Sequence, residues 1–333
     1  MKTVLITGAA GFIGSHLCDK FLSEGYRVVG IDDLSTGNKK NLSQAVLSHK
    51  FNFLEKDISQ KNSTKKIISK LDKLYFKPAI VAHLAAKKIP RYGKRLQTLI
   101  VNTEGTKNML EIARVFSSKF LLASTSDVYG MNPDLPFSED SNSVIGPSTV
   151  ARWAYAISKM FDEQLAFAYS EEFKVPVVIV RYFGSYGPRH HRSWWGGPQS
   201  VFIDAALKGQ LLPIHGDGKQ TRSFCYIKDT VEGTFLAAIN RKAVGEVINI
   251  GNDEVISILK MGKLIIGLMP ESTSMIKMVP YKSFNGKRYQ DVRQRVPNIV
   301  KAKSLLGWQP KISLRQGLII TIDWHKRNQQ EKL

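Results

Sequence analysis

Residues 3–14 read TVLITGAAGFIG, an aliphatic run that ends in three glycines, each placed three residues after the last. The run is typical of a buried strand, and Gly8, Gly11 and Gly14 are typical of a tight turn that opens into a helix. In such a turn the first glycine permits the bend, the second lets the backbone approach a phosphate, and the third allows close packing of helix against strand. The pattern therefore predicts a phosphate-binding turn at the amino terminus of a helix.

The chain beyond this turn alternates between short apolar runs and helical stretches. Further strands are expected at residues 27–32, 51–54, 79–84 and 119–124, and a helix at about 98–116. The alternation predicts an α/β fold, a Rossmann-like doubly wound parallel sheet with a smaller α/β carboxy-terminal domain. We expect a dinucleotide-binding domain at 1–181 and a substrate domain at 182–333, with residues 246–250 returning to the sheet as a strand.

Asp32 closes the second predicted strand, roughly 20 residues beyond the glycine turn. A carboxylate at this position accepts hydrogen bonds from ribose hydroxyls, which favours NAD over NADP as the cofactor. Two alternatives stay open: Asp32 caps a turn only, or Lys39 and Lys40 accommodate an additional phosphate. We predict NAD.

The net charge of +20 is the one unusual bulk property of this 333-residue chain. Its Lys and Arg residues are spread along the sequence, without a basic tail, an RNA-recognition signature or a zinc finger. We interpret them as background surface charge that also attracts an anionic substrate, and we expect no nucleic-acid partner. Nucleic-acid binding is kept as a minor alternative.

The cysteine and histidine residues do not suggest a metal site. Cys18 and Cys225 lie far apart, and His190 and His191 are adjacent, which is not metal-ligand spacing. The apolar run at 3–7 is too short for a signal peptide, and no run approaches the roughly 18 residues of a membrane span. These features predict a cytoplasmic protein with no metal and no membrane partner.

Tyr155 and Lys159 stand at positions i and i+4, which places them on one face of a helix. A free phenol has a pKa of about 10, and a neighbouring ammonium lowers that pKa toward the range in which the phenol serves as a base. Thr125, at the carboxyl end of the fifth predicted strand, is placed to hydrogen-bond the reacting hydroxyl. The alternative is a buried tyrosine beside a solvated lysine, which is common for an isolated pair of this spacing.

Together the motifs resemble those of the extended short-chain dehydrogenase/reductases, the NAD-dependent epimerase/dehydratase family. The resemblance rests on the glycine turn, His83-Leu84-Ala85-Ala86, Asn102-x-x-Gly105-Thr106, Ser124-Thr125-Ser126 and Tyr155-x-x-x-Lys159. It implies an enzyme that removes hydride from carbon 4 of a nucleotide-sugar, with Lys159 holding the nicotinamide ribose, and it implies a homodimer. The cofactor-binding residues assigned by motif and resemblance are Gly8, Gly11, Phe12, Ile13, Gly14, Asp32, Asp57, Ile58, Leu84, Ala85, Ala86, Tyr155 and Lys159.

Residues 125–130 read TSDVYG and bear on the fate of the 4-keto intermediate. They resemble the Thr-Ser-Glu of UDP-glucuronate decarboxylases, with Asp127 one methylene shorter, although GDP-mannose dehydratases share that motif. The resemblance implies that Thr125, Ser126 and Asp127 join the catalytic group. Residues 152–159 and 288–297 are also similar to segments of UDP-glucuronate decarboxylases, so the decarboxylation of a UDP-hexuronic acid is our leading hypothesis.

The candidate substrate-binding residues are Tyr92, Arg152, Arg192, Arg222 and Arg295. The resemblance implies Arg152, Arg222 and Arg295, whereas Arg192 is a candidate from the basic loop at 190–198. A planar guanidinium suits a sugar carboxylate, because it donates two parallel hydrogen bonds. Other interpretations stay open: Arg152 packs the helix start, and Arg295 serves only the nucleotide phosphates. Arg222 is expected to bind the diphosphate.

Two features depart from the pattern or stand outside it. Gly184 occupies a position where the family has an asparagine that contacts the substrate, and residues 190–198 form a basic, aromatic, glycine-hinged loop. We expect this loop to be a lid over the sugar, with a surface loop or a dimer contact as equal alternatives. The competing functions are a nucleotide-sugar 4-epimerase, a 4,6-dehydratase and, from another class, a non-catalytic Rossmann protein that binds a ligand or RNA.

Overall fold

A seven-stranded parallel sheet forms the centre of the part of the chain described by the computed structural model, which comprises residues 2–88, 94–194, 196–280 and 292–330. The order along the sheet is β11-β6-β5-β4-β1-β2-β3, which confirms the predicted Rossmann-like fold. The strands are β1 Thr3–Thr7, β2 Arg27–Asp32, β3 Phe51–Glu55, β4 Ile80–His83, β5 Lys119–Thr125, β6 Val177–Tyr182 and β11 Val247–Ile250.

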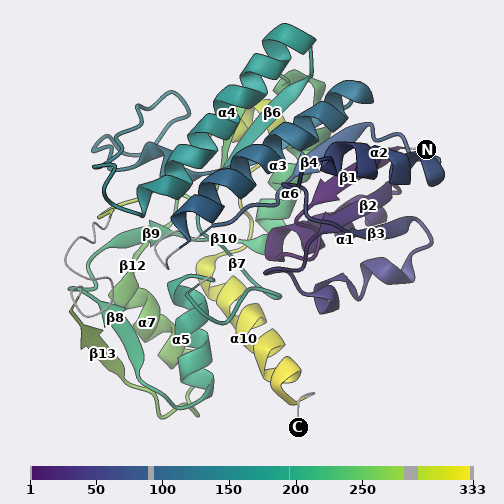
Figure 1. The fold of residues 1–333 in the computed structure, drawn as a ribbon. Coiled ribbons are helices and arrows are strands. Elements are labelled where there is room, and N and C mark those ends of the chain that lie inside the picture. The colour runs from purple at the N-terminus through teal and green to yellow at the C-terminus, as the bar shows by residue number, and fades with distance from the viewer. Residues whose placement is uncertain (1, 89–93, 195, 281–291, 331–333) are drawn as a thin grey trace.

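Helices cover both faces of this sheet, so its strands read as nearly continuous apolar runs. On one face α1 packs against α6, and on the other α2, α3 and α4 lie in a row. Figure 1 shows α3 and α4 side by side across the sheet. The bounds are α1 Phe12–Ser23, α2 Ser63–Lys73, α3 Arg95–Val115, α4 Trp153–Phe173 and α6 Ile227–Ile239.

A second region lies below the sheet in Figure 1 and is built from the later part of the chain. Its small sheets pair β13 with β8 in parallel and β12 with β9 antiparallel, while β10 pairs with β7. Its elements are β7 Ser185–Tyr186, α5 Pro198–Leu207, β8 Leu212–His215, β9 Thr221–Ser223, β10 Cys225–Tyr226, β12 Val255–Ser257, α7 Ile258–Gly267, β13 Ile276–Val279 and α10 Leu314–Gln330. Helix α9 Val300–Leu306 packs against β11 and α6 of the sheet layer instead. Short 3-10 helices are η1 Lys39–Leu42, η2 Ala45–Leu47, η4 Ser126–Tyr129 and η5 Arg241–Ala243.

The chain crosses between the two regions more than once. Residues 247–250 form β11, which pairs in parallel with β6, and this is the strand that the sequence led us to expect in the sheet. α6 also belongs to the sheet layer, although it lies beyond residue 182. The boundary between two domains at residues 181 and 182 therefore stays a prediction, because elements on both sides of it belong to the sheet layer.

The sheet reverses its strand order between β1 and β4, and such a switch point opens a crevice at the carboxyl ends of the strands. The glycine turn follows β1, Asp32 ends β2, Leu84 follows β4 and Thr125 ends β5. Because all seven strands are parallel, these predicted site residues lie at one edge of the sheet.

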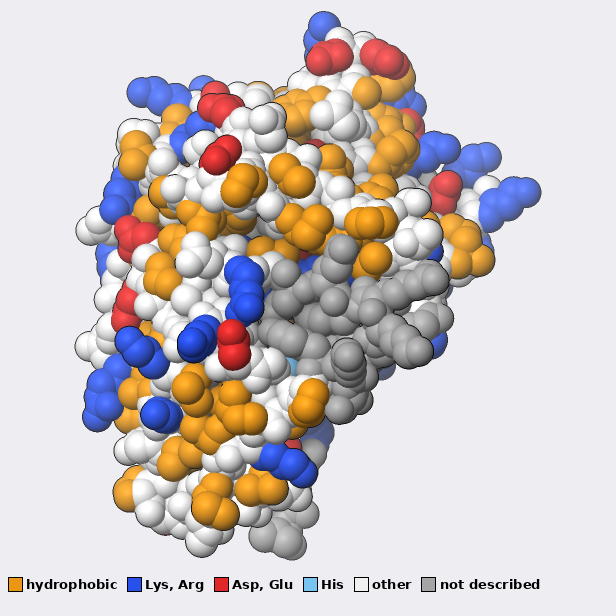
Figure 2. All heavy atoms as spheres, turned by 90° about the vertical axis from the view of Figure 1, so that its left-hand side faces the viewer, with side chains coloured by type: hydrophobic (Ala, Val, Ile, Leu, Met, Phe, Trp, Pro, Cys, Tyr) orange, Lys and Arg blue, Asp and Glu red, His pale blue; other side chains and the backbone are white. Residues whose placement is uncertain are grey.

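On the face shown in Figure 2, Lys and Arg side chains are dispersed among hydrophobic and uncharged ones and form no single basic patch. Within the described ranges, no helix has the length and apolarity needed to cross a membrane. The same residues contain no group of three or more His, Cys, Asp or Glu arranged to hold a metal ion.

Candidate active site

A cavity of about 1310 Å³ opens at the carboxyl ends of the strands, between the sheet and the second region. Small-molecule pockets measure roughly 300–1,000 Å³, so this cavity has room for a dinucleotide and a second ligand. Predicted site residues that line it are Gly8, Gly11, Phe12, Ile13, Gly14, Asp32, Asp57, Ile58, Leu84, Ala85, Ala86, Thr125, Ser126, Asp127, Arg152, Tyr155, Arg192, Arg222 and Arg295. Lys159 lies behind the wall, and Tyr92 falls outside the described residues.

The glycine turn forms a cradle that side chains would fill. Gly8 has a φ of +67°, in the left-handed region. A Cβ on Gly14 would lie 2.0 Å from the carbonyl oxygen of Gly8, so this helix can approach the strand only without a side chain there. The turn leaves backbone groups at the start of α1 facing the cavity, which suits the phosphates of a dinucleotide.

Asp32 is fixed at the end of β2 by two backbone donors. The Ala10 N–H donates to Asp32 Oδ2 at 3.0 Å, and the Leu34 N–H donates to Oδ1 at 2.8 Å. Burial raises the pKa of Asp32, and these two hydrogen bonds oppose that rise. The carboxylate lies against the cavity close to the glycine turn, where it suits a ribose diol.

Tyr155 lies in the first turn of α4, close to the end of β5, and lines the cavity. Burial and the carboxylates of Asp127 and Asp162 raise the pKa of its phenol, while a hydrogen bond with Thr125 lowers it. The sequence predicts that Lys159 brings this pKa toward neutrality. In the free protein the Lys159 ammonium is paired with a carboxylate, and its effect on the phenol stays a prediction.

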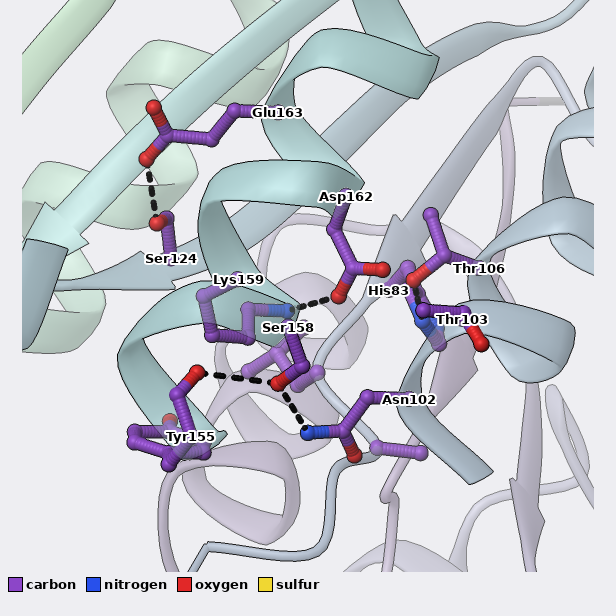
Figure 3. A network of polar contacts seen from close by, with 12 residues as sticks. His83, Asn102, Thr103, Thr106, Ser124, Tyr155, Ser158, Lys159, Asp162 and Glu163 are labelled. Atoms are coloured by element: carbon purple, nitrogen blue, oxygen red, sulfur yellow. Dashed lines mark hydrogen bonds and ion pairs between the residues drawn. The ribbon is translucent and has the colours of Figure 1, made fainter. Parts of the chain in front are cut away.

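That carboxylate is Asp162, one helical turn beyond Lys159 (Figure 3). Lys159 Nζ lies 3.0 Å from Asp162 Oδ2, and both side chains are almost entirely buried. The sequence analysis did not identify Asp162. The spacing of three residues between Lys159 and Asp162 could have indicated this ion pair, but the same spacing is common on solvated helix faces.

A polar network holds the start of α4 against α3 and β4. The Asn102 side-chain amide donates to Ser158 Oγ at 2.9 Å, and the Ser158 hydroxyl donates to the Tyr155 carbonyl at 2.9 Å (Figure 3). His83 lies between the hydroxyls of Thr7, at 2.7 Å, and Thr106, at 3.1 Å. Burial and the nearby Lys159 hold the pKa of His83 well below its usual value, so the ring is neutral.

Asp127 brings together two of the predicted substrate arginines. Arg295 Nη2 lies 2.7 Å from Asp127 Oδ1, and Arg152 Nη2 lies 3.7 Å from the same oxygen. Arg295 Nη1 also donates to Ser126 Oγ at 3.3 Å. Burial alone would raise the pKa of Asp127, but the two guanidiniums hold that pKa below its usual value. Two cations and one anion leave the cluster with an excess positive charge.

The other two arginines have different surroundings. Arg222 lies in β9, where its Nη1 donates to the Thr221 carbonyl at 2.7 Å, and it lines the cavity. Arg192 donates from Nε to His325 Nδ1 at 3.1 Å and from Nη2 to the His325 carbonyl at 3.2 Å. The predicted lid is thereby tied to α10. Sequence reasoning missed this helix, whose Trp324, His325 and Asn328 line the cavity.

Gly184 has a structural requirement of its own. Its φ is +51°, and a Cβ would lie 2.3 Å from the Ser223 carbonyl oxygen. The backbone of β9 therefore occupies the space in which an asparagine side chain would begin. Any substrate contact made by asparagine in the family is therefore absent here or comes from another group.

Comparison with known proteins bears on the function of this cavity. The family model described as GDP-mannose 4,6-dehydratase matches residues 5–321. A UDP-N-acetyl-alpha-D-glucosaminuronate decarboxylase of Bacillus cytotoxicus is 36% identical over 325 residues, 98% of this chain and 98% of the relative. UDP-glucuronic acid decarboxylase 1 of Xenopus tropicalis is 35% identical over 329 residues, 98% of this chain and 72% of the relative.

Among solved structures, the UDP-glucuronic acid 4-epimerase of Bacillus cereus in complex with UDP-glucuronic acid and NAD superposes with a TM-score of 0.82. It is 34% identical in sequence, and the match covers 98% of this chain and 99% of that one.

Proposed function

The chain belongs to the NAD-dependent epimerase/dehydratase family described by the GDP-mannose 4,6-dehydratase model, and we propose that it decarboxylates a UDP-linked hexuronic acid such as UDP-glucuronate. The single observation that carries this proposal is the Asp127 cluster. It places Arg152 and Arg295 at the cavity wall with a net positive charge. A sugar carboxylate is the ligand group that best matches paired guanidiniums.

NAD is the cofactor we propose, because the cradle fits it. The glycine turn at the start of α1 would hold its phosphates, and the carboxylate of Asp32 would accept from its ribose hydroxyls. When bound, NAD supplies the acceptor for the hydride that leaves carbon 4 of the sugar.

The proton of the carbon 4 hydroxyl passes to Tyr155, which Thr125 orients by a hydrogen bond. Once carbon 4 is a ketone, the substrate carboxylate belongs to a β-keto acid, and the bond to carbon dioxide breaks readily. The role of the protein is then to orient that carboxylate and to stabilise the enolate that remains, which takes up a proton at carbon 5. The hydride taken from carbon 4 returns to the ketone and Tyr155 gives its proton back to the carbon 4 oxygen, so the net change is the loss of carbon dioxide. Arg152 and Arg295 take the first role, and Ser126 and Asp127 fix Arg295.

The experiment is a panel of nucleotide-sugars incubated with the protein and NAD and followed by mass spectrometry. It should include UDP-glucuronate, UDP-N-acetylglucosaminuronate and, as a control without a carboxylate, UDP-glucose. The expected result is loss of the mass of carbon dioxide from a uronate only. Loss of the mass of water from a hexose would instead identify a dehydratase, and an inert panel would contradict the proposal.

A second candidate function is the 4-epimerisation of a UDP-hexuronic acid. It is favoured by the similarity over almost the whole chain to the Bacillus cereus UDP-glucuronic acid 4-epimerase. Both functions need the same carboxylate-binding arginines, so the cluster alone does not separate them. A uronate product of unchanged mass but altered configuration at carbon 4, seen by proton NMR, would identify the epimerase.

We also propose a homodimer in which α3 and α4 pair with the same helices of a second copy. Large apolar side chains remain exposed on both helices: Leu96 is 70% and Ile100 49% exposed, and on α4 Phe161 is 52% and Ile157 42% exposed. Each pair stands at i and i+4, so each forms a stripe on its helix. Neighbouring helices with exposed apolar stripes commonly form helix-bundle interfaces.

A further inference from the structure

The reaction described above makes no use of Asp162, which forms a buried ion pair with Lys159 behind the cavity wall. Lys159 and Asp162 lie on one face of α4, one turn apart, with 2% and 0% of their side-chain surface exposed. Figure 3 shows Asp162 directed toward Thr106 of α3 and His83 of β4, away from Tyr155. Burying a carboxylate costs free energy unless a charged partner compensates for the lost solvation, so the presence of Asp162 calls for a physical explanation.

We propose that Asp162 is a positioning residue: its carboxylate holds the Lys159 ammonium as a buried ion pair and balances the charge of that cation beside Tyr155. Asp162 thereby influences the pKa of Tyr155 without lining the cavity. The effect of this ion pair on the pH dependence of the reaction rests on the proposed function. Asp162 acts through Lys159.

The charges that face Tyr155 come from several elements. Asp127 follows β5 and carries Arg152 and Arg295 as partners, and Lys88 lies close enough to act on it as well. His83 on β4 is neutral, so it adds no charge. Lys159 and Asp162 on α4 complete the set, and their ion pair is nearly neutral as a unit.

The electrostatic effect of Asp162 on the phenol has a definite sign. Its carboxylate contributes to raising the pKa of Tyr155, together with burial and Asp127. Burial raises the pKa of Asp162 itself, and Lys159 and Thr106 counteract that rise. Removing the negative charge at Asp162 therefore lowers the pKa of Tyr155.

The first arm of the test is Asp162→Asn, which keeps the shape of the side chain and removes its charge. With NAD saturating, so that the profile reports the cofactor-bound protein, the expected result is a shift of the acidic limb of the kcat/KM against pH profile to lower pH by about one unit. Asp162→Ala, which also lacks the charge, must shift the limb in the same direction. The matched control is Glu163→Gln, because Glu163 is an equally buried carboxylate on the next residue that pairs with Arg181 instead. It should lower stability without moving the limb.

The second arm needs no substrate. Urea unfolding of Asp162→Asn, Lys159→Gln and the double variant forms a cycle, in which the double variant should lose less stability than the two single losses combined. The reason is that each single change leaves a buried charge or donor without its partner. If the stability losses of the two single variants add up to that of the double variant, the ion pair makes no contribution and the proposal is overturned. If the acidic limb does not move in Asp162→Asn, Asp162 has a packing role only, which also overturns the proposal. If no nucleotide-sugar is turned over, the proposed function has failed, and the unfolding cycle alone decides the ion pair.

Discussion

Tyr155 illustrates how one residue depends on charges supplied by distant parts of the chain. The carboxylates of Asp127 and Asp162 and the burial of the phenol all raise its pKa, and Thr125 is the group that opposes them. A phenol in these surroundings stays protonated in the free protein near neutral pH. The base is therefore ready only when additional positive charge or a hydrogen-bonding substrate arrives, which couples proton transfer to occupation of the site.

Replacing this phenol tests its role at the same scale. Tyr155→Phe should lower kcat by about 10²- to 10⁴-fold, because a ring without the hydroxyl cannot accept the sugar proton. Dinucleotide affinity, measured by calorimetry, should fall far less than kcat, since the glycine turn and Asp32 are untouched and only the contact of the Tyr155 hydroxyl is lost. A variant with wild-type turnover would contradict the assignment of Tyr155 as the base.

Gly184 provides a second test at the scale of single residues. Gly184→Asn restores the residue typical of the family, yet we expect it to destabilise this protein by about 1–3 kcal/mol. Its Cβ would meet the Ser223 carbonyl at 2.3 Å on a backbone with φ of +51°. Urea unfolding measures the change, and Gly245→Asn, at a positive φ with no atom within 4 Å, controls for the left-handed backbone alone. Equal losses in both variants would remove the steric argument.

At the scale of elements, residues 188–192 connect α1 to α10. On the α1 side His16 contacts the Pro188 carbonyl at 3.1 Å, Arg189 pairs with Asp19 at 2.7 Å, and His190 stacks on Phe12 at 4.0 Å. On the other side Arg192 contacts His325. The segment thus spans the amino terminus of α1, where dinucleotide phosphates are expected, and its attachment should govern how fast the cofactor leaves.

Arg192→Gln separates this role from the predicted substrate role of Arg192. If Arg192 mainly anchors the segment to α10, the release rate of NAD should rise about two- to tenfold, because a typical hydrogen bond is lost. In that case KM for the nucleotide-sugar should stay the same. Stopped-flow fluorescence of bound NADH measures the release. Arg192 Nη1 also lies 4.0 Å from Asp204 Oδ1. The control is therefore Lys208→Gln, which removes another cation paired with Asp204. A higher KM with unchanged release would restore Arg192 as a substrate ligand.

At the scale of the whole molecule, the sequence predicted what is encoded locally. The glycine turn, Asp32 and the strands before Tyr155 follow from short patterns, because a strand, a turn and a helix start are set by neighbouring residues. The contact of Asp127 with Arg295 joins residues far apart in the chain and was not predicted, although the resemblance implied that each residue belongs to the site. The pairing of Lys159 with Asp162 and the position of α10 were not predicted, since burial and long-range packing decide them.

The assembly is the remaining question at this scale, and the exposed apolar stripes of α3 and α4 make it testable. Phe161→Glu places a charge in the proposed interface, where it would be desolvated against apolar side chains of the second copy. We therefore expect wild-type protein to sediment as a dimer at micromolar concentration and this variant as a monomer. Leu47→Glu is the control, because Leu47 is 79% exposed but lies outside both helices. Since the same helix α4 carries Tyr155 and Lys159, the monomer should also lose part of its activity as the helix loses its packing partner. A wild-type monomer, or a Phe161→Glu dimer, would show that these stripes do not form the interface.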